Sequence, residues 1–313
     1  MSYTLFNPWF ITGLTDADGC FSVSIIKVKT CRLGYSLRLD YAINLAIRDK
    51  NLILQIKKFF NFGNISYSKD RSSIKFTVTN FIDLGIIIKF FQKFPLLTSK
   101  RHDFNLFVTV YEMVGRKEHL TVFGLLRAIA ITNNINFPVK PELLAKLVQA
   151  FGPLPKLLLP PVTILVRFLV IPSPWWIIGF ICGEGSFSYN EMTSSKMNSG
   201  QLLRFGLRFE VSQLTKDIYL LYAISIFLGF GNINSDKKRV MSKLTSANLT
   251  FLQHILIPFL LAHPIPGFKG LQFQMWLQAV VVRLQCSALK TYTSEDSDKL
   301  ARILSDLTKL RDK

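Results

Sequence analysis

The chain contains two copies of one sequence pattern. The segment NPWFITGLTDADGCFSV, which begins at Asn7, matches SPWWIIGFICGEGSFSY, which begins at Ser173. Two further matches follow in the same order: YAINLAIRDKNLILQIKKFFNFGNIS from Tyr41 with FEVSQLTKDIYLLYAISIFLGFGNIN from Phe209, and FPLLTSKRHDF from Phe94 with HPIPGFKGLQF from His263. The three matches have offsets of about 166 to 169 residues, and self-similarity at one offset indicates duplication. We therefore expect two copies of one fold.

A proline-rich segment, FGPLPKLLLPPVTILV, separates the two copies. Proline fixes φ and removes a hydrogen-bond donor, so this segment resists both helix interiors and central strands. We expect an N-terminal domain over residues 1–151, a linker over 152–172 and a C-terminal domain over 173–313. The length of 313 residues suits two domains, and hydrophobic residues, at 49%, supply material for two cores.

The net charge of +18 is shared between both halves of the chain. It predicts an extended polyanion or an anionic surface as the partner, although charge alone also fits a generically basic protein. The four cysteines form no CxxC pair and lie near no histidine cluster, so we expect neither a zinc site nor a disulfide scaffold. The most apolar stretches, 81–97 and 157–171, are interrupted by proline and charged residues, which predicts no membrane span.

Each copy opens with a predicted helix, over about residues 8–18 and 174–184. An Asn-Pro or Ser-Pro pair places an N-cap residue before a proline at the first helical position, and a glycine ends each helix. Small residues recur at a spacing of four, on one helix face where two backbones can approach closely; they are Gly13, Ala17, Gly179 and Gly183. We expect the two helices to pair about a pseudo-twofold axis. The alternative is that each helix is buried in a core of its own.

Alternating residues follow each of these helices. Phe21, Val23 and Ile25 fall on one side of a strand whose other side is mostly polar, and a second strand over 35–44 repeats the alternation. A helix over about 50–60 separates this hairpin from a second one that contains residues 73–78. The order is α-β-β-α-β-β-α, with an added helix near 121–131. We predict an α+β protein of two αββαββα repeats, each with a curved four-stranded antiparallel sheet.

Each predicted sheet has one polar face that carries basic residues. A two-stranded ribbon of this kind fits the major groove of DNA and can read base edges there. Sheet faces that are simply exposed to water produce the same alternation. The alternation therefore leaves both interpretations open until an active-site motif is considered.

The segments ITGLTDADG and IIGFICGEG resemble the signature of the LAGLIDADG homing endonucleases. The second segment departs from the first at Cys182, which stands where the first copy has Asp16. The downstream segments FPLLTSK and HLTVFGLL look like the organellar, intron-encoded, single-chain branch of that family, so the resemblance covers nearly the whole chain. In this family the last acidic residue of the motif is the catalytic acid, which implies Asp18 and Glu184.

Physical chemistry explains why the motif needs these residues. Two helices that pack along their small faces bring Asp18 and Glu184 together, where the carboxylates and the negative helix ends repel one another. Such a site favours Mg²⁺, a hard ion that prefers oxygen ligands, and Mn²⁺ or Ca²⁺ can substitute for binding. Ala17 and Gly183 are expected to contribute backbone carbonyls. A bound metal can activate water and stabilise the leaving oxygen. The alternative is that each acid merely ends a helix.

Three further catalytic residues follow from the resemblance. Lys100 and Lys269 match the basic residue that the family places near each scissile phosphate, where a positive charge stabilises the developing negative charge. The alternative for both is a solvated lysine. Gln213 matches a position that orients active-site water in many members, but its partner in the first copy is Leu45. The first half-site is therefore expected to hold water less tightly or to rely on Asn44 or Lys100.

Residues that face DNA follow from their parity with the two acids along the strands. Arginine and lysine pair with guanine, asparagine with adenine, and acidic residues with cytosine. The two halves differ at matching positions, so the target is expected to be asymmetric, with about one DNA turn for each half. The predicted contacts are Ser22, Ser24, Ile26, Val28, Ser36, Arg38, Asp40, Asn44, Lys75, Ser186, Ser188, Asn190, Met192, Arg204, Arg208, Glu210, Asn234 and Lys243.

Together these features predict a monomeric, site-specific double-strand DNA endonuclease that promotes intron homing and, as the family implies, leaves short 3′ overhangs. Two alternatives remain: an RNA-binding maturase that acts on the host intron, and a DNA-binding protein without activity. Retention of both acids favours cleavage. Motif residues begin by Asn7, so no presequence is expected. This absence and the resemblance predict an organelle-encoded mitochondrial protein, with a chloroplast as the alternative and no membrane partner.

Overall fold

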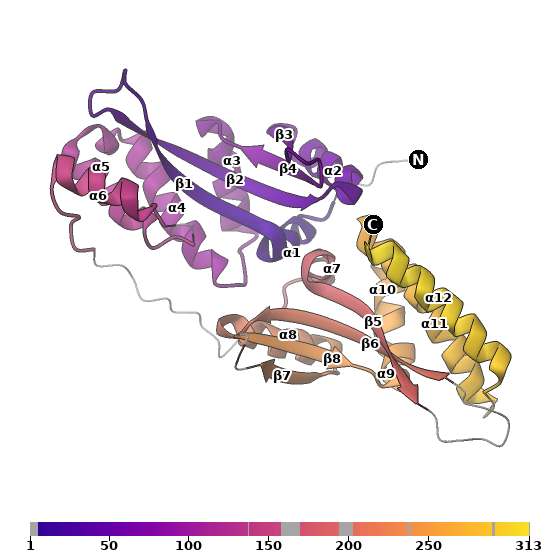
Figure 1. Cartoon of the computed structure of the whole chain (residues 1–313). Coiled ribbons are helices and arrows are strands. Elements are labelled where there is room, and N and C mark those ends of the chain that lie inside the picture. The colour runs from indigo at the N-terminus through magenta and orange to yellow at the C-terminus, as the bar shows by residue number, and fades with distance from the viewer. Residues whose placement is uncertain are drawn as a thin grey trace. The chain divides into compact units, whose positions relative to one another are not determined.

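The computed structural model describes residues 6–136, 138–157, 170–193, 203–236, 238, 240–289 and 292–312. The chain divides into two compact units (Figure 1). Unit 1 comprises Met1–Pro8 and Asp18–Arg167, and unit 2 comprises Trp9–Ala17 and Phe168–Lys313. The first helix therefore belongs mainly to the second unit. Most of the predicted linker, residues 158–169, lies outside the described residues.

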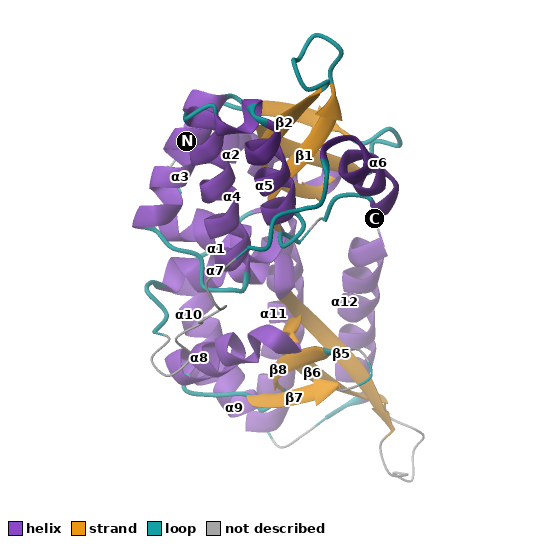
Figure 2. Cartoon of the chain, turned by 90° about the vertical axis from the view of Figure 1, so that its left-hand side faces the viewer, coloured by secondary structure: helices purple, strands orange, loops and turns teal. Residues whose placement is uncertain are grey.

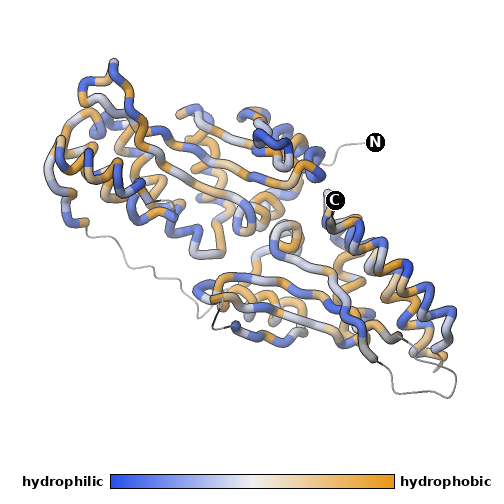
Figure 3. Tube along the Cα trace, in the orientation of Figure 1, coloured by the Kyte–Doolittle hydropathy of each residue, from blue (hydrophilic) through white to orange (hydrophobic). Residues whose placement is uncertain are grey.

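Unit 1 contains a four-stranded antiparallel sheet in the order β1-β2-β4-β3. Residues alternate between hydrophobic and hydrophilic along these strands, as the change of colour in Figure 3 shows. Side chains on one face are buried, among them Phe21, Tyr41 and Phe76. The two predicted hairpins of the first copy are thus confirmed. The strands are β1 (Gly19–Lys27), β2 (Tyr35–Ala46), β3 (Asn64–Tyr67) and β4 (Ser73–Val78).

Helices α2, α3 and α4 lie on one side of strands β1 and β2 (Figure 2). They supply aromatic side chains to the core: Phe60 of α2 stacks on Phe76 at 5.9 Å between ring centroids, and Phe91 of α3 meets Tyr41 at 5.4 Å. Burying these rings removes a large apolar area from water, which stabilises the unit. The helices of unit 1 are α2 (Lys50–Phe60), α3 (Phe81–Lys93), α4 (Lys100–Gly115), α5 (Val122–Thr132) and α6 (Pro141–Phe151), with 3₁₀ turns η1 (Ile47–Asp49) and η2 (Glu118–Leu120).

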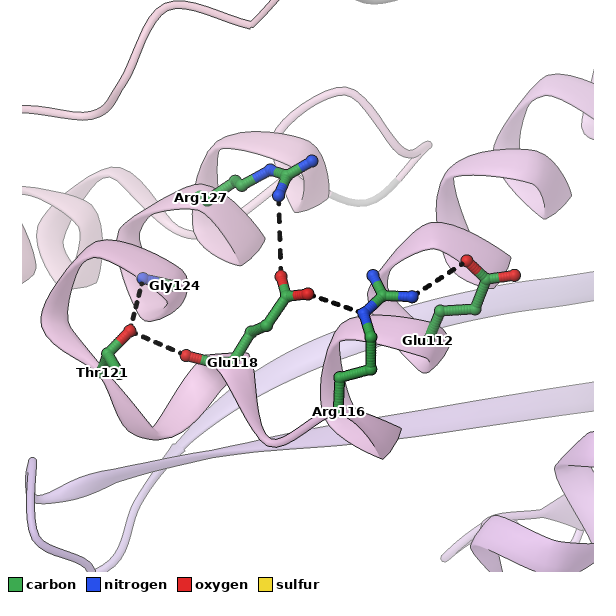
Figure 4. A network of polar contacts seen from close by, with 6 residues as sticks. All are labelled: Glu112, Arg116, Glu118, Thr121, Gly124 and Arg127. Atoms are coloured by element: carbon green, nitrogen blue, oxygen red, sulfur yellow. Dashed lines mark hydrogen bonds and ion pairs between the residues drawn. The ribbon is translucent and has the colours of Figure 1, made fainter.

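The corner between α4 and α5 is held by polar contacts (Figure 4). Glu118 lies 2.7 Å from Arg116 Nε and 3.6 Å from Arg127 Nη1. The Thr121 hydroxyl accepts a hydrogen bond from the Gly124 backbone N–H at 3.1 Å, which caps α5 at its N-terminus. These ion pairs lie at the surface and are individually weak, so they contribute little to stability.

A small hydrophobic cluster attaches α6 to the far end of the sheet. Leu147 of α6 is buried against Leu125 and Ile129 of α5, and Ile25 and Leu37 of the first hairpin pack onto them. Helix α6 was not predicted from the sequence. Its position matters for the site, because it borders the polar side of the same hairpin.

Unit 2 repeats the sheet of unit 1. Its strands β5 (Gly185–Thr193), β6 (Leu203–Leu214), β7 (Asn232–Asp236) and β8 (Met241–Ser246) have the order β5-β6-β8-β7, with the same antiparallel pairing. The predicted α+β class with two four-stranded antiparallel sheets is confirmed. The helices are α7 (Pro174–Glu184), α8 (Ile218–Leu228), α9 (Leu249–Phe251), α10 (Ile257–Ala262), α11 (Gly267–Ala288) and α12 (Ser294–Asp312), with 3₁₀ turn η4 (Thr215–Asp217) and π-helix η5 (Leu252–Leu256).

Helix α1 (Pro8–Asp18) packs directly against α7. A Cβ atom added to Gly13 would lie 2.0 Å from the Trp176 carbonyl oxygen, and one added to Gly179 would lie 2.1 Å from the Phe10 carbonyl oxygen. Only glycine permits this approach at the crossing. The predicted pairing of the two motif helices through their small faces is therefore confirmed.

A buried hydrogen bond also joins α1 to α7. The Trp176 indole N–H donates to the Asp16 carboxylate at 2.9 Å, and both side chains are buried. Asp16 thus has a structural contact that Cys182, at the matching position of the second repeat, does not reproduce: the Cys182 thiol lies 3.9 Å from the Pro266 carbonyl oxygen. Within the described part of the chain, no helix is long and apolar enough to cross a membrane.

Candidate nucleic-acid interface

The polar face of the first sheet is built by cross-strand pairs. In the register of β1 with β2, Ser22 stands opposite Asp40, and Ser24 stands opposite Arg38. In the register of β2 with β4, Asn44 stands opposite Lys75. Because successive residues of a strand point to opposite faces, these side chains share the face that the helices leave uncovered. The Ser22 hydroxyl donates a hydrogen bond of 2.9 Å to Asp40, which fixes both side chains on that face.

This face forms the floor of a cleft of about 870 Å³. Asp18, at the C-terminal end of α1, lines the cleft together with Ser22, Ser24, Asp40, Asn44 and Lys75. The structure therefore brings one predicted catalytic acid and five predicted contact residues of unit 1 to a single concave surface. Polar groups that converge on one concave surface are typical of ligand-binding sites.

The cleft also contains residues that the parity rule did not select. Tyr67 at the end of β3 and Lys140 at the start of α6 both line it, as do Ser66 and Ser68. The ammonium group of Lys50 lies 5.9 Å from the Tyr67 ring centroid, which adds positive charge at this edge. Lys140 reaches the cleft because α6 packs on the end of the first hairpin. A sequence pattern within one strand could not reveal that contact.

Lys100 and Lys75 both act electrostatically on Cys20, which lines the same cleft. Burial raises the pKa of the Cys20 thiol, the Asp40 carboxylate raises this pKa further, and the positive charges of Lys100 and Lys75 lower it. Lys100, the first residue of α4, is therefore close enough to the cleft to act on the Cys20 thiol. Because burial is the largest effect on its pKa, Cys20 remains a protonated thiol at neutral pH.

The polar face of the second sheet has the same construction with different residues. Ser186 stands opposite Glu210, Ser188 stands opposite Arg208, and Asn234 stands opposite Lys243. Glu210 lies 3.7 Å from both Arg208 and Lys243. Arg208 and Lys243 are exposed and Glu210 is half-buried, and the two ion pairs hold these three charged side chains in one group on the open face.

Most of the other predicted contacts also lie at accessible positions. Ile26, Asn190 and Asn234 are exposed, and Val28 and Ser36 are half-buried beside the turn of the first hairpin. The backbones of Met192 and Arg204 are paired in strands β5 and β6, but their side chains lie outside the described residues.

The second motif helix ends as the first one does. Glu184 is the last residue of α7, and both Glu184 and Gly183 are half-buried, like Asp18 and Ala17 at the end of α1. Lys269, in the first turn of α11, is half-buried as Lys100 is. Each unit therefore contains one carboxylate at a helix C-terminus and one lysine near the start of a later helix.

Gln213 lies on the buried side of β6. It is 7% exposed and falls on the same side of β6 as the buried Phe209 and Val211, opposite to Arg208 and Glu210. Its side-chain oxygen accepts a hydrogen bond from the Leu214 backbone N–H at 2.7 Å. The strand runs regularly through this position, so parity directs Gln213 into the core. The role of Gln213 in orienting active-site water stays a prediction.

The described residues include no group of three or more His, Cys, Asp or Glu side chains that could hold a metal ion. The oxygen donors that fit a hard divalent cation are instead the carboxylate and the last backbone carbonyls of each motif helix. Their chemistry suits Mg²⁺ or Ca²⁺ better than zinc or copper, which prefer nitrogen and sulfur ligands.

The fold is similar to that of solved LAGLIDADG homing endonucleases. The I-SmaMI LAGLIDADG homing endonuclease, in a crystal structure bound to cleaved DNA, is 28% identical in sequence, and the match covers 98% of each chain with a TM-score of 0.84. The I-LtrWI LAGLIDADG homing endonuclease bound to target DNA is also 28% identical, with 95% of this chain and 96% of that chain covered and a TM-score of 0.83.

Curated relatives are longer than this chain. "Probable intron-encoded endonuclease 3" of Neurospora crassa is 30% identical over 272 residues, which cover 86% of this chain and 49% of that protein. "Probable intron-encoded endonuclease 2" of the same organism is 28% identical over 282 residues, which cover 88% of this chain and 60% of that protein. The chain thus spans about half the length of these two relatives. The family model described as LAGLIDADG endonuclease matches residues 11–111 and again residues 177–280. With one match in each repeat, the chain belongs to the LAGLIDADG endonuclease family.

Proposed function

We propose that this chain is a site-specific homing endonuclease that cuts both strands of a long, asymmetric DNA target. The observation that carries the proposal is the cleft of unit 1. There Asp18, which ends a motif helix, lines the same concave surface as the polar residues of a helix-backed sheet. A surface that combines base-reading side chains with an acid at one end suits a nuclease that recognises sequence beside its cutting site.

Each sheet would lie in the major groove and read about one turn of DNA. The faces differ at matching positions: Asp40 in the first repeat corresponds to Arg208 in the second, and Asn44 corresponds to Ser212. Arginine favours guanine and aspartate favours cytosine, so the two half-sites cannot be the same sequence. An asymmetric target read by one chain also fits a monomer, because the duplication supplies the second half.

Asp18 and Glu184 act as the two catalytic acids, and each ends one helix of the motif pair. A carboxylate at a helix C-terminus is unfavourable, because the helix end already carries partial negative charge, and a cation relieves this repulsion. The carboxylates, together with the carbonyls of Ala17 and Gly183, would hold Mg²⁺. When bound, the metal would activate a water as the nucleophile and neutralise charge on the phosphate. I-SmaMI has been solved with an uncleaved DNA target in the presence of calcium ions, which supports a divalent cation in the family.

Lys100 and Lys269 supply fixed positive charge near the scissile phosphates. Their half-buried positions matter, because charges that are partly shielded from water act more strongly than solvated ones. The electrostatic effect of Lys100 on Cys20, a neighbour of the cleft floor, supports this role in unit 1. The product would carry short 3′ overhangs.

The relatives support an organellar, intron-encoded origin. One from Podospora anserina, 35% identical over 117 residues, is named for ND4 intron 1, and one from Saccharomyces cerevisiae, 22% identical over 294 residues, is named as a mitochondrial protein. We place this chain in mitochondria on that basis, with a chloroplast as the alternative. The alternative to double-stranded DNA as the substrate is the host intron RNA.

The test uses the full chain, Mg²⁺ and a library of candidate intron-insertion sequences. We expect cleavage at one asymmetric site. Asp18→Asn and Glu184→Gln should each reduce the cleavage rate at least about a hundredfold while DNA affinity is retained, because each removes a charge that acts on the reaction. Asp306→Asn, at an exposed position of α12, is the matched control and should cut normally. Normal cutting by either active-site variant would disprove the assignment of that residue as a catalytic acid. Stimulation of splicing without cleavage at any site would favour the host intron RNA as the substrate.

A further inference from the structure

The outer surface of α2 and α3 combines lysines with exposed isoleucines. Lys57 and Lys58 of α2 and Lys89 and Lys93 of α3 are exposed. On α3 they lie beside Ile82, which is 75% exposed, and Ile86, which is 48% exposed. Lysine-rich surfaces and exposed isoleucines each occur separately on many proteins. Their combination on two neighbouring helices needs an explanation.

The residues of α3 form one straight stripe. Ile82, Ile86, Lys89 and Lys93 are spaced by four, three and four residues, so they lie along one helix face. The opposite face carries the buried residues that pack under the sheet, including Phe91. The stripe is therefore apolar in its first half and basic in its second half, and it points away from the core.

Helix α2 joins this stripe at its basic end. The rings of Phe59 and Phe90 lie 5.9 Å apart, and the rings of Phe60 and Phe90 lie 5.4 Å apart. These contacts join the C-terminal parts of the two helices, where Lys57 and Lys58 of α2 occur. The acidic residue of the two helices, which are fully described, is Asp83 in the first turn of α3, and it is half-buried, whereas the four lysines are exposed. The surface thus carries a local excess of positive charge.

DNA recognition does not account for this surface. Phe60 and Phe91 pack against the buried face of the sheet, and the polar face with Asp40, Asn44 and Lys75 is on the other side. Figure 2 shows α2 and α3 to the left of strands β1 and β2. A duplex held on the polar face would be separated from the lysines of α2 and α3 by the sheet and by the helices themselves.

The repeat fold does not require these lysines either. At the positions that match Lys57 and Lys58, helix α8 of the second repeat has Ser225 and Ile226. The same fold is therefore built without them, and the basic surface is specific to unit 1.

We propose that the outer surface of α2 and α3 binds the anionic surface of a phospholipid bilayer. Clusters of four or more lysines on an amphipathic helical surface are attracted to anionic headgroups, and adjacent apolar side chains enter the boundary of the acyl chains. Binding to RNA phosphates would use the lysines but would leave Ile82 and Ile86 in water. A bilayer accounts for both features. The polar face of the sheet stays available for DNA, so the proposal is independent of the nuclease function.

The test is flotation of the full chain with vesicles of phosphatidylcholine alone or of phosphatidylcholine mixed with phosphatidylglycerol. We expect binding only to the anionic vesicles. Each lysine contributes about a five-fold factor, so Lys57→Gln with Lys58→Gln should weaken binding about thirty-fold. Ile82→Ser with Ile86→Ser should weaken it about tenfold or more, because two apolar side chains no longer enter the bilayer.

The matched control is Lys146→Gln with Lys216→Gln, which removes the same charge at exposed positions on α6 and η4. This variant should bind vesicles like the unchanged chain. Circular dichroism and DNA affinity establish that all variants are folded. Equal vesicle binding by the control and the Lys57/Lys58 variant would overturn the proposal. So would unchanged binding by the isoleucine variant, or a loss of RNA affinity in the Lys57/Lys58 variant without a loss of vesicle binding.

Discussion

Replacing Gly179 by alanine has two opposite effects on stability: alanine favours the helix, but its Cβ atom clashes at the helix crossing. In a helix interior alanine is favoured over glycine by about 1 kcal/mol, so propensity alone predicts a more stable protein. At the α1–α7 crossing, however, the new Cβ would lie 2.1 Å from the Phe10 carbonyl oxygen and 2.7 Å from the Leu14 backbone nitrogen. Both neighbours are backbone atoms, which cannot move away without moving their helix.

The magnitude follows from this geometry. The helices would have to separate by about 1.3 Å to restore the 3.4 Å of an ordinary contact. Separation would loosen the packing around Phe10, Leu14 and Trp176, all of which are buried. Overpacking of a core costs about 1–3 kcal/mol, and a backbone clash lies at the upper end. After the propensity gain is subtracted, we expect a net loss of about 2 kcal/mol, or about 4–8 °C in the unfolding temperature of a unit of this size.

Thermal unfolding followed by circular dichroism measures this loss. Gly115→Ala is the matched control, because Gly115 is also helical but its added Cβ would meet only the Phe81 side chain, at 3.3 Å. A shift of a few tenths of an ångström relieves that contact, so the control should unfold within a few degrees of the unchanged chain. If Gly179→Ala unfolds at or above the temperature of the unchanged chain, the close approach of the two helices is wrong.

Two further predictions concern single hydrogen-bonded groups. Trp176→Phe removes a donor to the buried Asp16 carboxylate and should destabilise the protein by about 1–3 kcal/mol in urea unfolding, and an unchanged midpoint would contradict the contact. In the turn between β3 and β4, hydrogen bonds from Ser68 and Ser72 lower the pKa of Asp70 to about 2. Because this pKa is depressed, the contribution of Asp70 to the turn is complete above its unfolded pKa of about 3.9 and is lost as the pH falls towards 2. Amide NMR shifts of Ser72 should report that loss, and the same shifts in Asp70→Ala should be insensitive to pH over this range.

Much of the fold follows from local patterns. The alternation of Phe21, Val23 and Ile25 identified the buried face of β1, and the predicted helix over 50–60 has the bounds of α2. These predictions succeed because each depends on residues that are neighbours in one element. The placement of Asp40, Asn44 and Lys75 on one face follows from the same rule, since antiparallel pairing preserves parity across strands.

Other features depend on contacts that no local pattern contains. Gln213 was assigned from family resemblance, although its parity with Val211 already indicated the buried face. The Trp176–Asp16 hydrogen bond joins residues 160 positions apart, and nothing in either segment identifies the other as its partner. Lys140 reaches the cleft only because Leu147 buries α6 against α5. The elements and their faces are determined by local sequence, whereas these contacts depend on how the elements pack.

The assignment of α1 to unit 2 has a consequence for synthesis on the ribosome. Residues 9–17 are translated well before their packing partner Trp176, which follows Asp16 by 160 residues. At about 5–20 residues per second, the interval is about 8–32 s. During it, Phe10, Ile11 and Leu14 have no α7 to bury them. The nascent chain therefore carries an apolar segment that stays without its packing partner until α7 is translated.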